Sequence, residues 1–134
     1  MNYEHLLMFI AIRSTRKPWE PQLKTTIFML LNATPAWLRL TQPARRAFLS
    51  DVVGPILAAH PATRTRYYDV EAFTGRCSDL AVFETEDLKD YADLVDALRD
   101  TAFFSAPYYE VVDILPGIEN GYRDNVARLL AAES

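Results

Sequence analysis

The sequence is short of the residues that make covalent cross-links and metal sites. It has one cysteine, Cys77, and two histidines, His5 and His60, in 134 residues. A single cysteine cannot close an internal disulfide, so we expect a protein of the reducing cytoplasm. No spacing presents several metal ligands together, so we expect no metal site. We interpret His60, which precedes Pro61 at a helix end, as a partner of the helix dipole.

Glycine is also scarce, with four residues. The chain contains no P-loop, no dinucleotide-binding glycine pattern and no G-x-S-x-G nucleophile motif. Cys77 has two charged neighbours: Arg76 favours a reactive thiolate, and Asp79 opposes it. No histidine is paired with Cys77 in the sequence, so we interpret it as a packed structural thiol, with a nucleophile as the alternative.

Excess positive charge and long hydrophobic runs are missing as well. The formal net charge is -4, whereas nucleic acids and anionic membranes attract clustered positive charge. The apolar run at 6–12 is far shorter than the roughly 20 residues of a spanning helix. Glu4 and His5 stand before it in place of the basic flank of a signal peptide. We therefore expect no nucleic-acid partner, no membrane span and no export.

What remains is typical of a soluble globular domain. Hydrophobic residues make up 50% of the chain and charged residues 24%. This length can bury a core in one domain without disulfides or metal. Near the N-terminus, Pro18 and Pro21 break regular structure. We predict an N-terminal extension at 1–22 and one domain at 23–134. The alternative is that the extension forms an arm or edge strand covering the domain or its partner.

The domain is organised around residues 63–87, which predict a long β-hairpin running into a helix. Residues 63–73 are rich in β-branched and aromatic types, and apolar residues resume at 76–84. Between them Gly75 can take the positive φ of a tight hairpin turn. Thr85 is the expected cap of the following helix. The second strand is apolar on both faces, so both should be covered, one by helices and the other by a second subunit or a ligand pocket.

Two further strands and three helices precede or follow the hairpin. Residues 24–33 predict a strand. A helix capped by Thr41 should follow and kink at Gly54-Pro55, because proline cannot donate to the preceding turn. After the hairpin, residues 86–99 predict a helix, 108–115 a strand ended by Pro116-Gly117, and 118–132 a C-terminal helix.

This order predicts an α+β fold of ferredoxin-like type, βαββαβ with a C-terminal helix. Two crossovers of one hand place both helices on one face of a four-stranded antiparallel sheet. The other face is bare in such a monomer, yet the strands put apolar groups there. Burial against a second copy is the simplest cover, and it would give a homodimeric α/β barrel.

Three stretches resemble a known family: ATPAWLRL, AFTGRCSDLAVFETEDLKDY and LRDTAFFSAPYYEVVDILPGIENGY. They are similar to the darcynins, small bacterial proteins. The resemblance spans roughly residues 25–122, and its most specific runs are 76–79 and 99–104. It implies a bacterial origin and supports the domain limits. It carries over no activity and no catalytic residues.

Polar side chains inside the predicted strands are the candidates for a site. A charge on an otherwise apolar sheet face must be paired or must line a wet cavity. One interpretation is salt bridges at strand edges and across a dimer interface. The other is a small-molecule pocket between sheet and helices, which needs aromatic walls and a few convergent polar groups. Its candidate residues are Trp37, Arg66, Tyr68, Arg76, Asp79 and Glu110.

Two functions fit this sequence. The first is a homodimeric binding or accessory module for a small apolar or aromatic molecule, without a cofactor. The second, by analogy of fold alone, is a cofactor-independent oxygenase or isomerase acting on an aromatic substrate. It would use Asn32, Trp37 and Arg66 or Arg76 to hold an anionic substrate. A haem protein is least expected, since His60 is the only plausible axial ligand.

Overall fold

The computed structural model describes residues 24–119 and 128–132. The predicted extension at 1–22 lies outside the described residues, and so do residues 120–127 of the predicted C-terminal helix. Residues 128–132 are helical. The start of that helix was predicted wrongly, because Ile118 is the last residue of a strand.

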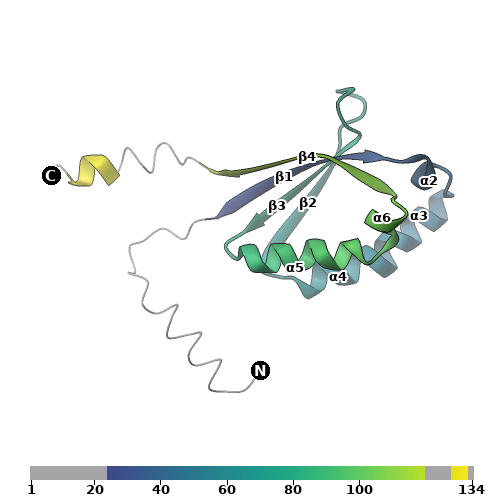
Figure 1. Ribbon diagram of the computed structural model, residues 1–134, viewed down its shortest axis with the longest axis horizontal. Helices are drawn as coiled ribbons and strands as arrows, with labels where there is room; N and C mark the ends of the chain where they lie inside the picture. The colour runs from purple at the N-terminus through teal and green to yellow at the C-terminus, as the bar shows by residue number, and fades with distance from the viewer. Residues whose placement is uncertain (1–23, 120–127, 133–134) are drawn as a thin grey trace, which may run out of the picture.

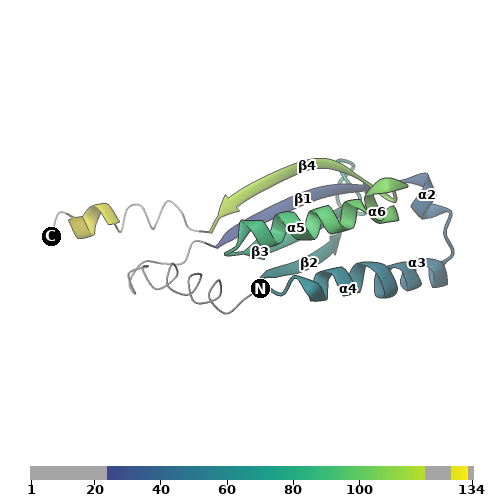
Figure 2. The same ribbon diagram turned by 60° about the horizontal axis from the view of Figure 1, so that its bottom comes forward.

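The described chain folds into one antiparallel sheet of four strands with helices on one face (Figures 1 and 2). The strands are β1 (Thr25–Ala33), β2 (Thr63–Asp69), β3 (Asp79–Thr85) and β4 (Tyr109–Ile118). Their order across the sheet is β2-β3-β1-β4, and every neighbouring pair is antiparallel. This is the predicted ferredoxin-like order, with β1 and β3 at the centre and β2 and β4 at the edges.

The β2–β3 hairpin is less tight than its sequence suggested. β2 ends at Asp69 and β3 begins at Asp79, so residues 70–78 form a loop instead of strand ends around a two-residue turn. Gly75 was predicted to take a positive φ, but no glycine does so in the part of the chain that the structure describes. Phe73, predicted in the strand, lies in this loop with 88% of its surface exposed. The loop projects from the sheet on the side away from the helices (Figure 1).

The edge strand β4 is longer than predicted. Pro116 and Gly117 were expected to stop it, but it continues through both to Ile118. Pro116 pairs with Ile27 of β1. Because β4 is an edge strand, the missing N–H of proline can face away from the sheet without breaking a ladder.

The first helical layer comprises α2 (Pro35–Leu38), α3 (Gln42–Phe48), the π-helix η1 (Leu49–Val53) and α4 (Gly54–Ala59). As predicted, Thr41 caps α3, with its hydroxyl accepting from the N–H of Ala44. The predicted irregularity before Pro55 is a π turn, in which Gly54 N–H donates to the carbonyl of Leu49, five residues earlier. This wider turn accommodates a proline that has no N–H for a regular α-helical bond.

The second helical layer comprises α5 (Leu88–Arg99) and the short α6 (Ala102–Ser105). The cap of α5 is Asp87, whose carboxylate accepts from the N–H groups of Lys89 and Asp90. Thr85 was the predicted cap, but it ends β3 and is buried. The predicted connector after this helix instead forms α6, which buries Phe103.

The core lies between the sheet and these helices. Alternate residues of the central strands enter it, including Ile27, Met29 and Leu31 of β1 and Ala81 and Phe83 of β3. The helices contribute Trp37 from α2, Leu94 and Leu98 from α5, and Phe103 from α6. The intervening strand residues point to the opposite face, which no described helix covers (Figure 2).

Candidate functional site

A cavity of about 300 Å³ lies between the helix-covered face of the sheet and the helices, and we call it the helix-side cavity. Its volume is at the lower end of the range for ligand sites, roughly 300–1,000 Å³. Its wall includes residues from β1, β2, β3, η1, α4, α5 and α6 and from the start of β4. No charged side chain lines it.

The cavity exists because α3, η1 and α4 of the first helical layer pack loosely against the sheet. No residue of α3, η1 or α4 is fully buried, whereas α5 buries Leu94 and Leu98. The side chains of Leu49, Val53 and Leu57 face the cavity without filling it. The π turn places these residues, and Gly54 beside them adds no side chain. Leu49 is 43% exposed and Tyr67 of β2 is 48% exposed, so they mark the mouth.

Aromatic rings form one wall of the cavity, and Trp37 packs behind that wall. Tyr109 at the start of β4 stacks on Phe103, with ring centroids 4.8 Å apart and planes inclined by 24°. Trp37 packs on the same tyrosine at 5.2 Å, and Tyr67 approaches it edge-on at 6.4 Å. Phe104 meets Phe103 edge-on at 4.7 Å. Such a wall suits a flat apolar ligand.

The lining residues Tyr67 and Tyr109 carry hydroxyl groups. Tyr67 and Tyr109 share a side-chain hydrogen bond. Thr65 lies two residues before Tyr67 on the same face of β2 and also lines the cavity. Its Oγ1 is buried and is the one buried side-chain polar atom without a hydrogen-bond partner among the described residues. A buried hydroxyl left unpaired costs stability, so its presence requires an explanation.

The two tyrosines are held in their neutral form. Burial raises the pKa of Tyr109 to about 12, although its hydrogen bond with Tyr67 acts in the other direction. Burial also raises the pKa of Tyr67, and Tyr109 and Asp79 add to that rise. An ordinary tyrosine is already protonated at neutral pH, and the raised pKa values extend the neutral form of these two phenols further into the alkaline range.

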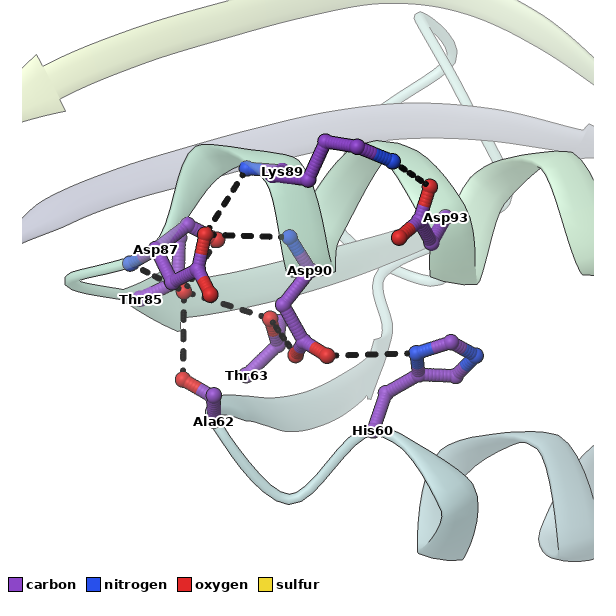
Figure 3. Close-up of polar contacts among 8 residues, drawn as sticks. All are labelled: His60, Ala62, Thr63, Thr85, Asp87, Lys89, Asp90 and Asp93. Carbon is purple, nitrogen blue, oxygen red and sulfur yellow. Dashed lines mark hydrogen bonds and ion pairs between the residues drawn. The ribbon is translucent and has the colours of Figure 1, made fainter. Parts of the chain in front are cut away.

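A polar cluster fixes the end of α4 to α5 (Figure 3). Asp90 of α5 lies between two partners: its Oδ2 accepts from the Thr63 hydroxyl at 2.8 Å, and its Oδ1 is 3.2 Å from His60 Nδ1. The Thr63 hydroxyl is 3.2 Å from that of Thr85, which accepts from Asp87 N–H at 3.0 Å. This Asp90 cluster joins α4, β2, β3 and α5 at one end of the layer. His60 belongs to it and does not line the cavity.

The helix-free face of the sheet has a second, wider cleft of about 790 Å³. Phe28, Tyr68 and Val82 supply apolar walls. Arg66 of β2 and Glu84 of β3 form an ion pair at this cleft. They are diagonal neighbours, because Arg66 pairs with Val82 and Glu84 pairs with Arg64. The exposed loop residue Phe73 stands at its rim.

The predicted site residues do not surround one pocket. Arg66 and Tyr68 line the cleft on the helix-free face. Trp37 is buried in the core on the other face, where the Arg45 guanidinium lies 5.9 Å from its ring. The reason is strand alternation: successive β2 residues point to opposite faces.

The remaining three candidates lie elsewhere on the sheet. Arg76 of the loop pairs with Asp113 of β4 at 3.7 Å, and Glu110 of β4 is exposed opposite Asn32. Asp79 is hydrogen-bonded by the Ser78 hydroxyl at 2.6 Å and lies close enough to Tyr67 and Tyr109 to raise their pKa values. Burial raises the pKa of Asp79 itself, against the effect of Ser78.

Sequence reasoning missed Thr65, Tyr67 and Tyr109 as cavity residues. A signal was present in the alternation of β2, which puts Thr63, Thr65 and Tyr67 on one face and Arg64, Arg66 and Tyr68 on the other. The site prediction was based on polar and charged residues inside the strands, so it chose Arg66 and Tyr68 of the second set. Tyr109 of β4 could not be found this way, because β2 and β4 are far apart in the sequence and their side chains come together only in the folded protein.

Neither a metal centre nor a spanning helix is found in the described ranges. No group of three or more His, Cys, Asp or Glu side chains could hold a metal ion within residues 24–119 and 128–132. Within these same ranges, no helix has the length and apolar character needed to cross a membrane.

Comparison with known sequences gives the same family in each case. A family model described as Darcynin, domain of unknown function, matches residues 10–133. A darcynin of Chromobacterium violaceum is 51% identical over 75 residues, which are 56% of this chain and 95% of that protein. A darcynin homologue of Granulibacter bethesdensis is 42% identical over 111 residues, covering 82% of this chain and 87% of the homologue.

Comparison with solved structures shows the fold alone. An arginine-to-lysine mutant of chlorite dismutase from Candidatus Nitrospira defluvii superposes with a TM-score of 0.63 at 20% identity, over 82% of this chain. The same enzyme in complex with imidazole gives 0.60 at 14% identity, over 71% of this chain. The matched part spans 46% and 39% of those chains, so this protein covers less than half of their length.

Proposed function

The chain belongs to the darcynin family, whose function is unknown, and we propose that this member is a binding protein for a small apolar or aromatic molecule that works as a homodimer. The observation that carries the binding role is the helix-side cavity with its apolar lining and its wall of aromatic rings. An apolar cavity with a few polar groups is the usual form of a small-molecule site.

The size of the cavity limits the ligand. An engineered cavity of about 150 Å³ binds benzene, so a cavity of about 300 Å³ takes a substituted single ring or a small fused pair. Apolar lining supplies affinity through removal of ligand surface from water. The loosely seated first helical layer gives the ligand a route in at Leu49 and Tyr67.

The helix-free face supports the homodimer. Phe28 and Leu115 are direct partners across β1 and β4, and both stay 39–46% exposed beside the buried Val82. Tyr68 extends the apolar area on β2. The ion pairs Arg66–Glu84 and Arg76–Asp113 stand among these apolar residues and near the edges of the sheet. A second copy of the same face would cover the apolar groups and keep the ion pairs near its rim.

The alternative of an oxygenase or isomerase loses its specific support at this cavity. That hypothesis needs Arg66 or Arg76 to hold an anionic substrate, and neither lines the helix-side cavity. Asn32 is also engaged, since its Oδ1 accepts from the N–H of Ser78 at 3.0 Å.

The test is ligand binding by the full chain with and without the cavity. Ala81 is buried at the cavity wall, so Ala81→Leu should fill part of the space. We expect a screen of substituted benzenes and indoles to raise the melting temperature of the wild type, because binding to the native state stabilises it by mass action. Ala81→Leu should lose that rise.

Ala92→Leu is the matched control, because Ala92 is exposed on α5 away from the cavity wall. It should keep the full rise. The proposed site would be wrong if no compound raises the melting temperature of the wild type. It would also be wrong if a compound raises the melting temperature of Ala81→Leu as much as that of Ala92→Leu.

A further inference from the structure

The loop between β2 and β3 presents an aromatic side chain beside the cleft on the helix-free face, which we call the helix-free cleft. We infer that Phe73 of one copy inserts into the helix-free cleft of a second copy, with the strands of the two sheets running in opposite directions. In this arrangement Glu71 of each copy meets Arg64 of the other. The inference rests on the homodimer of the proposed function, since it names the residues through which that dimer forms.

The first observation is the exposure of Phe73 on an ordered loop. Phe73 is 88% exposed, more than any other large hydrophobic residue that the structure describes. Backbone hydrogen bonds nevertheless fix the loop: Phe73 N–H donates to the carbonyl of Val70 at 2.9 Å, and Val70 N–H donates to that of Ser78 at 3.0 Å. An aromatic side chain on a fixed backbone loses little conformational entropy on binding, so it suits the anchor of an interface.

The second observation is the position of this loop. It projects from the sheet on the side away from the helices, which is the side of the helix-free cleft (Figure 1). Phe28, Tyr68 and Val82 give the cleft apolar walls, and its volume is about 790 Å³. Since an engineered cavity of about 150 Å³ binds benzene, the cleft has room for a phenyl ring from a second copy. A copy stacked on this face therefore meets the loop and the cleft together.

Two-fold symmetry leaves two limiting ways to stack this face on itself. If the strands run in opposite directions, each β2 lies over the β2 of the other copy, and each loop lies over the far end of that strand. If the strands run in the same direction, each loop lies over the first residues of the other copy's β4. The reason is that Asp79 and Tyr109 start β3 and β4 at the same end of the sheet, where they flank the end of β1.

The charges on the face favour opposite strand directions. The exposed Glu71 of the loop lies at one end of β2 and the exposed Arg64 at the other, and neither forms an ion pair among the described residues. β4 instead begins with the exposed carboxylate of Glu110, and its Asp113 is already paired with Arg76. Opposite directions thus place Glu71 against a cation, whereas the same direction places it against carboxylates.

The acidic groups near Arg64 do not cancel this complementarity. Glu84 is paired with Arg66, and the carboxylate of Asp87 caps α5. Glu119 follows β4, at the edge of the sheet opposite to β2. Lys24 lines the same groove as Arg64 and adds a second positive charge at this end.

The first test removes the anchor from the full chain. Phe73→Ser should raise the dissociation constant of the dimer by roughly tenfold or more, measured by sedimentation velocity over a concentration series. Leu88→Ser is the matched control, because Leu88 is also an exposed apolar residue but lies on α5. It should dimerise like the wild type.

The second test reverses the two charges in separate proteins. Glu71→Arg and Arg64→Glu each place like charges across the interface, so each alone should weaken the dimer by roughly tenfold or more. An equimolar mixture of the two variants should form a dimer with one copy of each, because opposite charges then face each other at both contacts. Native mass spectrometry identifies this mixed dimer by its mass, and circular dichroism shows that each variant is folded.

The outcomes separate this inference from the proposed function. A Phe73→Ser protein that dimerises like the wild type would overturn the anchor and leave the homodimer. A mixture of the folded charge variants that forms no mixed dimer would overturn the opposite strand directions. A monomeric wild type would overturn the homodimer of the proposed function and this inference with it, while ligand binding in the helix-side cavity is decided by its own screen.

Discussion

Asp90 is a single residue on which several elements of the fold depend. Its carboxylate accepts from Thr63 and contacts His60, and its side chain is only 18% exposed (Figure 3). Asp90→Ala should lower the free energy of unfolding by about 1–3 kcal/mol, because it leaves the buried Thr63 hydroxyl without its closest acceptor. Urea unfolding followed by circular dichroism measures the change.

Asp93 on the same helix provides the control. It pairs with Lys89 one turn away, and the lysine is exposed to solvent. Asp93→Ala should therefore change stability little, since exposed ion pairs contribute weakly. Equal losses in the two variants would show that the Asp90 cluster does not hold α4 against α5.

Tyr109 makes a prediction about alkaline pH. Its pKa is about 12 in the folded protein, above the ordinary tyrosine value near 10, so the folded state keeps the proton that the unfolded state loses. The stabilisation is complete below about pH 10 and is lost as pH rises toward 12. Between pH 9 and pH 11.5 the wild type should lose about 1–2 kcal/mol more than Tyr109→Phe, measured by urea unfolding.

Other groups titrate in the same range, so the comparison between the two proteins is the informative quantity. Absorbance at alkaline pH should also show tyrosines that ionise late. Identical pH profiles for the wild type and Tyr109→Phe would mean that the Tyr109 phenol is not held in its neutral form by the fold.

Within the first helical layer, the segment from α3 to α4 should be less protected than α5. None of the residues of α3, η1 and α4 is fully buried, and one end of the layer is held by the Asp90 cluster. Because local opening needs little energy where few apolar groups are buried, amides at 42–59 should exchange with deuterium faster than those of α5. Hydrogen exchange with mass spectrometry measures both segments in one sample.

The same hydrogen-exchange experiment can be repeated with a ligand bound. A compound in the helix-side cavity should slow exchange at η1 and α4, whose residues line it, and leave the outer face of α5 unchanged. Protection of α5 alone, or slower exchange in the first layer than in α5 without ligand, would contradict the loosely seated layer.

The strand β2 shows where sequence reasoning was strong and where it failed. Its β-branched and aromatic residues predicted a strand correctly. The site prediction then chose Arg66 and Tyr68 because they are polar residues in an apolar context. In the structure they share a face with Glu84 and Phe28, while the cavity lies behind the strand at Thr65 and Tyr67.

The whole molecule should assemble through the helix-free face. Phe28→Lys puts a charge at the centre of the exposed apolar area, so it should convert the proposed homodimer to a monomer at micromolar concentration. Size-exclusion chromatography with light scattering measures the mass. Leu88→Lys is the matched control, because Leu88 is also an exposed apolar residue but lies on α5.

The mass of the wild type tests the homodimer before any variant is compared. A wild-type monomer at high micromolar concentration would remove the homodimer, and the helix-free face would then need another cover. A dimer that survives Phe28→Lys but is lost with Leu88→Lys would move the interface to the helical side.

The sequence by itself determined the order of elements and the sheet. Periodicity, the Thr41 cap and the Gly54-Pro55 pair are local signals, and the crossover rule then leaves few topologies, so β2-β3-β1-β4 followed. The family could also be recognised from the sequence, because the runs at 76–79 and 99–104 are contiguous in the chain.

Only the tertiary structure decided the site. Thr65, Tyr67 and Tyr109 belong to two edge strands on opposite sides of the sheet, and they share a cavity because the first helical layer stands away from the strands between them. The length of β4 depended on its being an edge, where Pro116 is tolerated. The orphan hydroxyl of Thr65 is likewise a property of packing, since a side chain lacks a partner only when its surroundings are fixed in three dimensions.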